Sequence, residues 1–344
     1  MTKVICKCAG LLILLLAAAL PCSAQQAAAY KYFRVGNAAD AHGTPRAGYA
    51  LMGGGKDLDE AFLWLCGRAN GGDLLVVRAT GTDAYNSYIQ GLCHLNSVAT
   101  LVIPNREAAN DPFVEKTIRS ASAIFISGGD QANYIRYWEH SPAQGALRDA
   151  VAKGVPIGGT SAGLAVMGDF SYTAMADKPD EPDLDGKTAL MNPLSPRITL
   201  DRNFLLIPIL FHTITDTHFA KRDRMGRLLV FLSRIYLGCI HIDFSHDPEI
   251  RGIGVEERAA ILLEPDGRAK VVGYGSAYFV DLDREFDNAP SNQPKPLTWG
   301  PYFVQRVSPG QMFNIKTWTG QALSYTLTVE DGDIHSSQAG GAIY

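Results

Sequence analysis

The chain has 344 residues, of which 47% are hydrophobic and 19% are charged, so it can bury a sizeable core and is neither wholly disordered nor fibrous. Its 31 Lys and Arg residues against 35 Asp and Glu residues give a net charge of −4, and we expect no broad nucleic-acid-binding surface. Length alone allows one large domain or two.

The amino end has the three zones of a secretory signal peptide. Lys3 and Lys7 precede the apolar run 9–20, and the small-residue stretch 21–24 follows it. The run is too short for a transmembrane helix, which needs about 20 apolar residues. We therefore expect residues 1–24 to be removed and the mature protein to be secreted, periplasmic or extracellular, with no membrane attachment.

Removal of this segment would leave three cysteines, Cys66, Cys93 and Cys239. An odd number allows at most one disulfide and leaves at least one free thiol, but the sequence does not say which cysteines pair. No Cys or His spacing is typical of a zinc site. We expect no metal and no cofactor.

From about Gly48, short apolar runs alternate with glycine-containing turns and segments of helical period, which predicts an α/β fold with a mostly parallel sheet. The predicted strands are 49–52, 74–77, 100–103, 123–126 and 155–157, and the clearest predicted helices are 112–121 and 146–153. Residues 169–200 lose all periodicity and contain four prolines, which predicts a long surface loop.

A strand-like run at 204–210 and a helix at about 219–235 come next, and β-rich sequence follows to the end. The sequence shows no internal repeat and no linker long enough to separate independent domains. We expect an N-terminal segment at 25–47, an α/β domain at 48–285 and a β-rich C-terminal extension at 286–344.

The strongest chemical signal is Gly159-Thr160-Ser161-Ala162-Gly163, which fits the G-x-S-x-G nucleophile elbow. In that motif a strained strand-to-helix turn exposes a serine, and here the pentapeptide follows an apolar strand and opens an apolar helix. Ser161 is the candidate nucleophile, and the N–H of Ala162 would point toward a developing oxyanion. The alternative is a plain glycine-rich turn with a helix-capping serine.

A serine nucleophile needs a base, and five histidines follow it in the chain: His212, His218, His241, His246 and His335. His218 stands after a strand and at the start of a predicted helix, where α/β sheets place catalytic groups. Nearby arginines disfavour its protonation and would keep the imidazole a neutral base. The alternative is a solvated basic helix that begins with a capping histidine.

A second strand-to-helix turn, Ser127-Gly128-Gly129-Asp130-Gln131, should open at the same edge of the sheet. Its glycines permit close backbone approach, so Gly129 is a candidate for a second oxyanion N–H and Gln131 for a substrate contact. The alternative, compatible with the first, is that Asp130 caps a helix. The run Gly53-Gly54-Gly55-Lys56 lacks the spacing of a phosphate-binding loop, and we assign it no function.

These blocks together resemble a known family. The turn 127–131, the elbow 158–163, the block Asp216-x-His218-Phe219-x-x-Arg222-x-Arg224-x-x-Arg227 and the run 252–257 resemble, in order and spacing, the cyanophycinase group of serine peptidases, relatives of aspartyl dipeptidase. The resemblance covers about 48–280. Thr217 departs from it, because cyanophycinases commonly have glutamine there, and Glu256 replaces a frequent aspartate.

The resemblance implies a three-layer α/β fold of the class I glutamine-amidotransferase-like (flavodoxin-like) type. It implies that Ser161 is the nucleophile, His218 the base and Glu257 the acid that orients the base. It also associates further residues with substrate binding or site architecture: Gln131, Asp216, Arg222, Arg224 and Arg227.

The expected activity is that of a secreted serine peptidase that hydrolyses aspartyl peptide bonds, first of all in cyanophycin (multi-L-arginyl-poly-L-aspartate), with β-Asp-Arg dipeptides as products. The alternative is an exopeptidase or dipeptidase for short aspartyl or isoaspartyl peptides. An α/β-hydrolase esterase is disfavoured, because the candidate triad runs Ser161, His218, Glu257 instead of serine, acid, histidine. We expect a peptide or polymer substrate and no nucleic-acid partner, and the sequence leaves a homodimer open.

Overall fold

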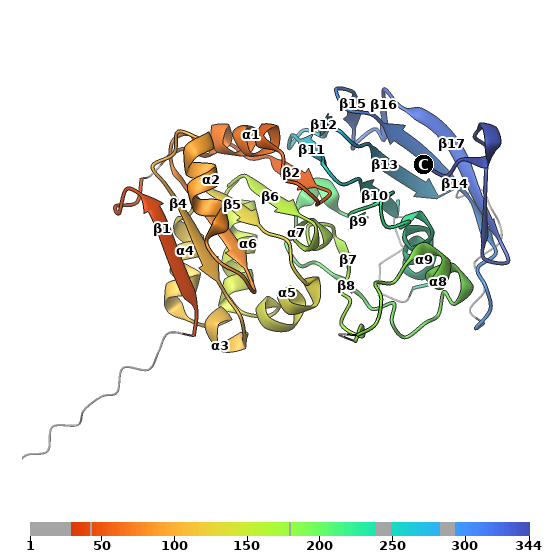
Figure 1. Cartoon of the computed structure of the whole chain (residues 1–344), viewed down its shortest axis with the longest axis horizontal. Helices are drawn as coiled ribbons and strands as arrows, with labels where there is room; N and C mark the ends of the chain where they lie inside the picture. The colour runs from red at the N-terminus through yellow and green to blue at the C-terminus, as the bar shows by residue number, and fades with distance from the viewer. Residues whose placement is uncertain (1–28, 42, 179, 239–248, 283–292) are drawn as a thin grey trace, which may run out of the picture.

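The computed structural model describes residues 29–344 except 42, 179, 239–248 and 283–292. The expected signal peptide and Cys239 lie outside the described residues. Two β-sheets stand side by side; most helices surround the first, and the C-terminal strands extend both (Figure 1). None of the helices in the described part of the chain is long and apolar enough to cross a membrane.

The first sheet has the strand order β1-β4-β3-β5-β6-β2-β11-β12-β15-β16. Its central strands run parallel: β2 (Tyr49–Met52), β3 (Asp73–Arg78), β4 (Ser97–Val102), β5 (Ala123–Ile126) and β6 (Ile157–Thr160). Antiparallel strands flank them: β1 (Lys31–Gly36), β11 (Ala259–Leu263), β12 (Arg268–Gly273), β15 (Met312–Asn314) and β16 (Thr319–Gly320). The expected mostly parallel core sheet is confirmed.

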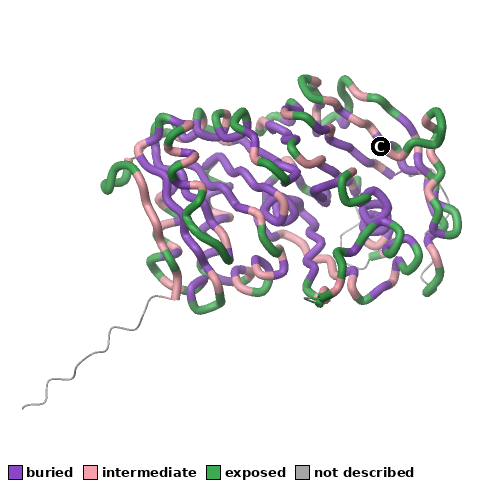
Figure 2. Tube along the Cα trace, in the orientation of Figure 1, coloured by how far each residue is buried: buried purple, intermediate pink, exposed green. Residues whose placement is uncertain are grey.

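Helices cover both faces of the parallel strands and complete three layers. One face packs against α1 (Asp59–Ala69) and α2 (Ala84–Leu92). The other packs against α3 (Arg106–Ala109), α4 (Pro112–Ser120), α5 (Gln131–Trp138), α6 (Pro142–Ala152) and α7 (Ala162–Ala165). Because both faces are covered, every residue of β2 and of β5 is buried, and Figure 2 shows the strands as the buried interior.

The second sheet has the order β18-β17-β14-β13-β10-β9-β7-β8. Its strands are β7 (Phe170–Tyr172), β8 (Leu200–Arg202), β9 (Thr213–Asp216), β10 (Arg251–Val255), β13 (Ala277–Leu282), β14 (Trp299–Val307), β17 (Leu323–Glu330) and β18 (Asp333–Ser336). Helices α8 (Gly186–Met191) and α9 (Met225–Tyr236) share an apolar cluster with it. The β-rich C-terminal region is therefore confirmed, and its strands continue both sheets.

A disulfide joins Cys66 in α1 to Cys93, the residue after α2. The sequence left this pairing open. Both cysteines are buried in the apolar cluster between these helices and the first sheet, so the bond ties two helices of one layer together.

Residues 169–200 are not a surface loop, contrary to the prediction. They contain β7 and α8, and Phe170, Leu184 and Ala189 are buried. A strand of 3 residues and a helix of 6 residues are too short to produce a recognisable hydrophobic period.

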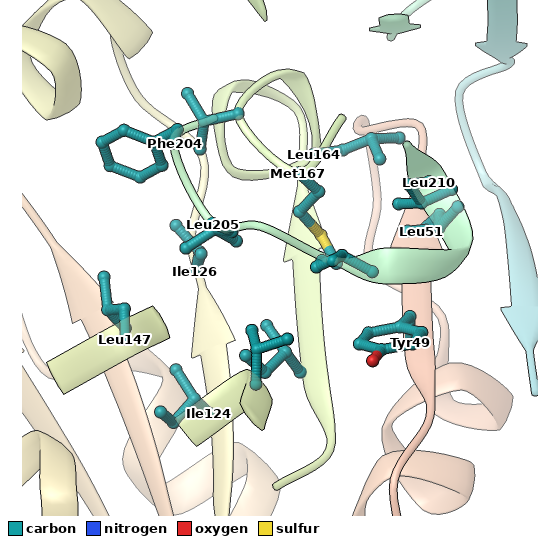
Figure 3. Packing of buried hydrophobic residues seen from close by; sticks show 14 of the residues in the cluster. Tyr49, Leu51, Ile124, Ile126, Leu147, Leu164, Met167, Phe204, Leu205 and Leu210 are labelled. Carbon is teal, nitrogen blue, oxygen red and sulfur yellow. The ribbon is translucent and has the colours of Figure 1, made fainter. Parts of the chain in front are cut away.

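The run 204–210 does not form a strand, so that prediction is also wrong. The carbonyl oxygen of Phe204 accepts hydrogen bonds from Gln144 and Arg148 of α6, Leu206 has a positive φ of 58°, and 208–210 form a 3-10 turn. Phe204, Leu205 and Leu210 instead pack over side chains of β2, β5 and α7 (Figure 3). The strand that precedes His218 is β9.

Candidate active site

Ser161 lies on a strained turn between β6 and α7. Its φ of 52° and ψ of −120° are outside the regions that non-glycine residues usually adopt. Gly163 makes the turn feasible, because a Cβ at this position would lie 2.0 Å from the carbonyl oxygen of Ile126 in β5. The backbone therefore passes close to the sheet while the serine stands at the carboxyl end of β6.

The structure brings Ser161, His218 and Glu257 together. Oγ of Ser161 lies 2.7 Å from Nε2 of His218, and Nδ1 of His218 lies 2.7 Å from Oε1 of Glu257. In this arrangement the carboxylate fixes the tautomer and orientation of the imidazole. Ser161 follows a strand of the first sheet, whereas the other two follow β9 and β10 of the second, so the triad is assembled across both sheets.

The glycine turn 53–55 after β2 supports the histidine and the glutamate. The carbonyl oxygen of Gly53 accepts from the N–H of His218 at 2.8 Å. A Cβ at Gly54 would lie 2.5 Å from Cε1 of His218, and one at Gly55 would lie 3.1 Å from Cβ of Glu257. This turn is assigned no function from the sequence alone. A signal was present, because three glycines directly follow a strand that runs parallel to the strand before Ser161.

The electrostatics keep His218 neutral. Burial lowers the pKa of His218 below its ordinary value of 6.5, and the charges of Arg222 and Arg224 lower it further, while the hydrogen bond with Glu257 acts in the opposite direction. The hydrogen bond from His218 lowers the pKa of Glu257. At neutral pH the pair is therefore an imidazole and a carboxylate, the state that a general base requires.

A pocket of about 480 Å³ opens beside the triad. Gly129 and Ala162 line it, and Ala162 begins α7, where the first N–H groups of a helix have no intrahelical acceptor. Gln131, the first residue of α5, lines it too. Asp130 accepts a hydrogen bond from the N–H of Ala132 and so caps α5, as the sequence also allowed.

The expected basic helix starts later than predicted, at Met225, because residues 219–223 form turns in which Asp223 has a φ of 48°. The three arginines therefore occupy different places. Arg222 precedes the helix and is partly exposed, and Arg224 is buried with Nη1 on the carbonyl oxygen of Thr217. Arg227 is buried and donates to both carboxylate oxygens of Asp216, so this pair forms a wall of the pocket.

Several residues between Tyr172 and Leu184 also line the pocket, and one of them, Asp183, contacts two of the arginines. Nη1 of Arg222 and Nη2 of Arg224 donate to the same oxygen, Oδ2 of Asp183, at 2.6 Å and 2.9 Å. Asp183 lies within 169–200, the part of the chain predicted to be a loop, and no sequence motif points to it.

The other histidines that the structure describes form no second site of this kind. His212 lies just before β9, at the opposite end of that strand from His218, and His335 lies on β18. His241 and His246 are outside the described residues. Among the residues that the structure describes, no group of three His, Cys, Asp or Glu side chains is placed to hold a metal ion.

Comparison with known proteins identifies relatives. Residues 52–194 match the profile of Peptidase family S51, a stretch that holds Ser161 but neither His218 nor Glu257. The chain is 30% identical over 187 residues to a cyanophycinase of Nostoc sp. (strain PCC 7120), which covers 54% of this chain and 53% of that protein. It is 28% identical over 228 residues to a cyanophycinase of Synechococcus elongatus, covering 65% and 62%.

Among solved structures, that of a peptidase from an acI-B1 Actinobacterium covers 79% of this chain and 98% of its own, at 17% identity and a TM-score of 0.49. The chain spans about half the length, 53%, of the Nostoc relative. The segment that carries the Ser161 elbow is therefore similar to Peptidase family S51, and the chain is similar to cyanophycinases over about half to two thirds of its length.

Proposed function

We propose that this protein is an exported serine peptidase that hydrolyses aspartyl peptide bonds, with cyanophycin as the substrate and β-Asp-Arg dipeptides as the products. The observation that carries the proposal is the continuous chain of contacts from Ser161 through His218 to Glu257, at 2.7 Å each, beside a pocket lined with arginines. Similarity to cyanophycinases supports the choice of substrate.

The geometry fits acyl transfer. Oγ of Ser161 attacks the aspartyl carbonyl carbon while Nε2 of His218 accepts its proton, and Glu257 stabilises the imidazolium through Nδ1–H. The N–H groups of Ala162 and Gly129 are the donors for the tetrahedral oxyanion. His218 then protonates the leaving amine, and water, deprotonated by His218, hydrolyses the acyl-enzyme.

The pocket matches a substrate that carries both charges. Each cyanophycin unit presents the carboxylate and the guanidinium of an arginine linked to an aspartyl β-carboxyl. The lining contains carboxylates and cations: Asp130, Asp177 and Glu181 against Arg136, Lys178, Arg222 and Arg224. Opposite charges of this kind favour a zwitterionic ligand over an apolar one.

A dipeptidase for short aspartyl or isoaspartyl peptides is the second candidate. The observation that favours it is that Tyr172, Asp177 and Asp183 contribute to the wall of the pocket. A wall at that position leaves less room for a polymer that must run past the nucleophile on both sides.

The test uses the mature protein and its Ser161→Ala variant. Both are incubated with insoluble cyanophycin and with a panel of aspartyl and isoaspartyl dipeptides, and the products are identified by mass. We expect β-Asp-Arg from the unaltered protein and a loss of turnover on the order of 10⁶-fold in the variant, with the same melting temperature. Undiminished hydrolysis by Ser161→Ala would exclude the mechanism, and cleavage of dipeptides alone would select the second candidate.

Export is part of the proposal and has its own support. The Cys66–Cys93 disulfide belongs to a class of bond that persists mainly in oxidising compartments outside the cytosol. The test expresses the whole chain in a bacterial host and determines the amino terminus of the product by mass. A product that starts at Gln25 in the periplasm or medium is expected, whereas a cytosolic product that retains residues 1–24 would contradict export.

A further inference from the structure

We propose that the Asp183 carboxylate binds where the carboxylate of an acidic substrate would bind. In the free protein it forms ion pairs with the guanidinium groups of Arg222 and Arg224, and an acidic substrate displaces it. Asp183 would then set the affinity of the site for acidic ligands without taking part in bond cleavage. Only the acidic character of the ligand rests on the proposed function.

The contact between Asp183 and the two arginines leaves hydrogen-bonding capacity unused. A single oxygen, Oδ2 of Asp183, accepts from Nη1 of Arg222 at 2.6 Å and from Nη2 of Arg224 at 2.9 Å. Nε of Arg224 is buried and has no hydrogen-bond acceptor among the described residues. A ligand carboxylate that used both of its oxygens would engage Nη2 and Nε of Arg224 as a bidentate pair, which is stronger than a shared single oxygen.

Arg224 needs a negative partner even when no substrate is bound. Its side chain is only 7% exposed; Nη1 donates to the carbonyl oxygen of Thr217 at 3.0 Å and lies 3.7 Å from Oδ1 of Asp216. Burial and the nearby charge of Arg227 lower the pKa of Arg224 to about 10. Because Asp216 is already bonded through both oxygens to Arg227, Asp183 adds the second negative charge beside the two buried cations.

Asp183 can supply that charge and still leave. Its side chain is 61% exposed, so water can solvate the carboxylate as soon as it leaves the arginines. Its backbone is fixed on both sides, because Arg197 donates to the carbonyl oxygen of Pro182 at 2.8 Å and Arg227 to that of Leu184 at 3.0 Å. Displacement therefore requires only rotation of one side chain and no movement of the pocket wall.

The pair formed by Asp216 and Arg227 shows the contrast. Their side chains are 3% and 4% exposed, and the guanidinium donates hydrogen bonds to both carboxylate oxygens. We therefore expect this pair to stay intact when a substrate binds. The competing explanation for Asp183 is that it stays in place and binds a cationic group of the substrate with its other oxygen. The two explanations predict opposite effects of removing its charge.

The experiment measures binding of succinate, a dicarboxylate with no peptide bond, by isothermal titration calorimetry. It compares the unaltered protein with Asp183→Asn, Asp183→Ala and Asp180→Asn. Asp180 is an exposed carboxylate of the same segment, so its variant removes the same charge without touching the arginines. We expect succinate to bind roughly fivefold more tightly to both Asp183 variants than to the unaltered protein, since the Asp183 carboxylate no longer competes for the two guanidinium groups. Asp180→Asn should bind succinate as the unaltered protein does.

Two further readouts separate displacement from a structural effect. With an acidic peptide substrate, KM should fall in Asp183→Asn while kcat stays the same, and a crystal structure with succinate should show the Asp183 side chain turned away from Arg222 and Arg224. Unchanged or weaker succinate binding in both Asp183 variants, or no binding by any of the four proteins, would overturn the proposal. Succinate binding as expected without hydrolysis of any aspartyl peptide would instead remove only the proposed function.

Discussion

At the residue scale, two adjacent glutamates at the end of β10 have different tasks. Oε1 of Glu257 lies 2.7 Å from Nδ1 of His218. The carboxylate of Glu256 accepts from the hydroxyl of Tyr278 and from the N–H of Ser276, at 2.7 Å each. The position of Glu257 beside the histidine was available from the resemblance, whereas nothing in the local sequence alone distinguishes it from its neighbour.

The first prediction compares these two glutamates. Glu257→Gln should lower kcat by about 10⁴-fold with little change in melting temperature, because an amide favours the wrong tautomer of His218. Glu256→Gln should retain activity but destabilise the fold by about 1–3 kcal/mol, because an amide has one acceptor oxygen for two donors. Steady-state kinetics and thermal unfolding check both, and the reverse ranking would mean that the acid is Glu256.

The second prediction concerns the pH dependence of the base. Burial lowers the pKa of His218 below 6.5, and the charge of Arg222 contributes to the shift. Activity requires the neutral imidazole, so kcat/KM should fall as the pH falls through this lowered pKa. Arg222→Gln removes a positive charge and should raise the pKa, moving the acid limb of the profile to higher pH.

Arg136→Gln is the control for this shift, because Arg136 lines the same pocket but is exposed on α5. Its acid limb should coincide with that of the unaltered protein. An acid limb that stays in place in Arg222→Gln, or that moves equally in both variants, would show that Arg222 does not tune His218.

Asp183 marks the limit of what could be inferred from single residues. It lies 39 and 41 positions from its two arginine partners, in a segment without hydrophobic period. Ion pairs between such distant positions leave no local pattern, because charged side chains are typical of any exposed loop. The elbow around Ser161, in contrast, is encoded by five consecutive residues and could be recognised directly.

At the element scale, the parallel strands were predictable because each is a short, fully buried apolar run between glycine-containing turns. The same rule failed at 204–210, where apolar residues are buried without strand pairing. The helix predicted at 219–235 also begins later, at Met225, since apolar spacing does not reveal that 219–223 are turns. Tertiary contacts decide such cases, and local sequence does not contain them.

The third prediction concerns the glycine turn after β2. Gly54 has a φ of 95°, and a Cβ there would lie 2.5 Å from Cε1 and 2.6 Å from Nε2 of His218. Gly54→Ala should therefore displace the imidazole from Ser161 and lower kcat at least 10²-fold, since small misplacements of catalytic groups have effects of this size. Kinetics and a crystal structure of the variant check this.

Gly67→Ala is the matched control, because Gly67 lies inside α1 and a Cβ there would meet nothing within 4 Å. This variant should keep full activity and gain about 0.5–1 kcal/mol of stability, as alanine favours a helix more than glycine does. Normal activity in Gly54→Ala would mean that the turn does not position His218.

At the scale of the whole molecule, the site depends on the junction between the two sheets. Ser161 follows a strand of the first sheet, and His218 and Glu257 follow strands of the second. Strands near the C-terminus continue both, since β15 and β16 extend the first and β14, β17 and β18 extend the second. Periodicity alone could indicate that these residues are β-rich, but not that they are divided between two sheets, because strand pairing is a long-range choice.

The last prediction concerns the stability of the whole fold. The Cys66–Cys93 bond closes a loop of 27 residues, and a loop of this length corresponds to about 3–4 kcal/mol of stabilisation through the unfolded chain. The double variant Cys66→Ala, Cys93→Ala should therefore unfold at a lower denaturant concentration. Its kcat at 25 °C should change little, because both cysteines lie in the layer of α1 and α2 and the triad lies at the ends of β6, β9 and β10.

Reductant supplies the control for this prediction. It should lower the unfolding midpoint of the unaltered protein toward that of the double variant, and leave the midpoint of the double variant unchanged. Thiol titration must show in parallel that the bond has been reduced. If the fully reduced protein unfolds at the same denaturant concentration as the oxidised one, the disulfide does not stabilise this fold, and the first sheet with its helices is held by packing alone.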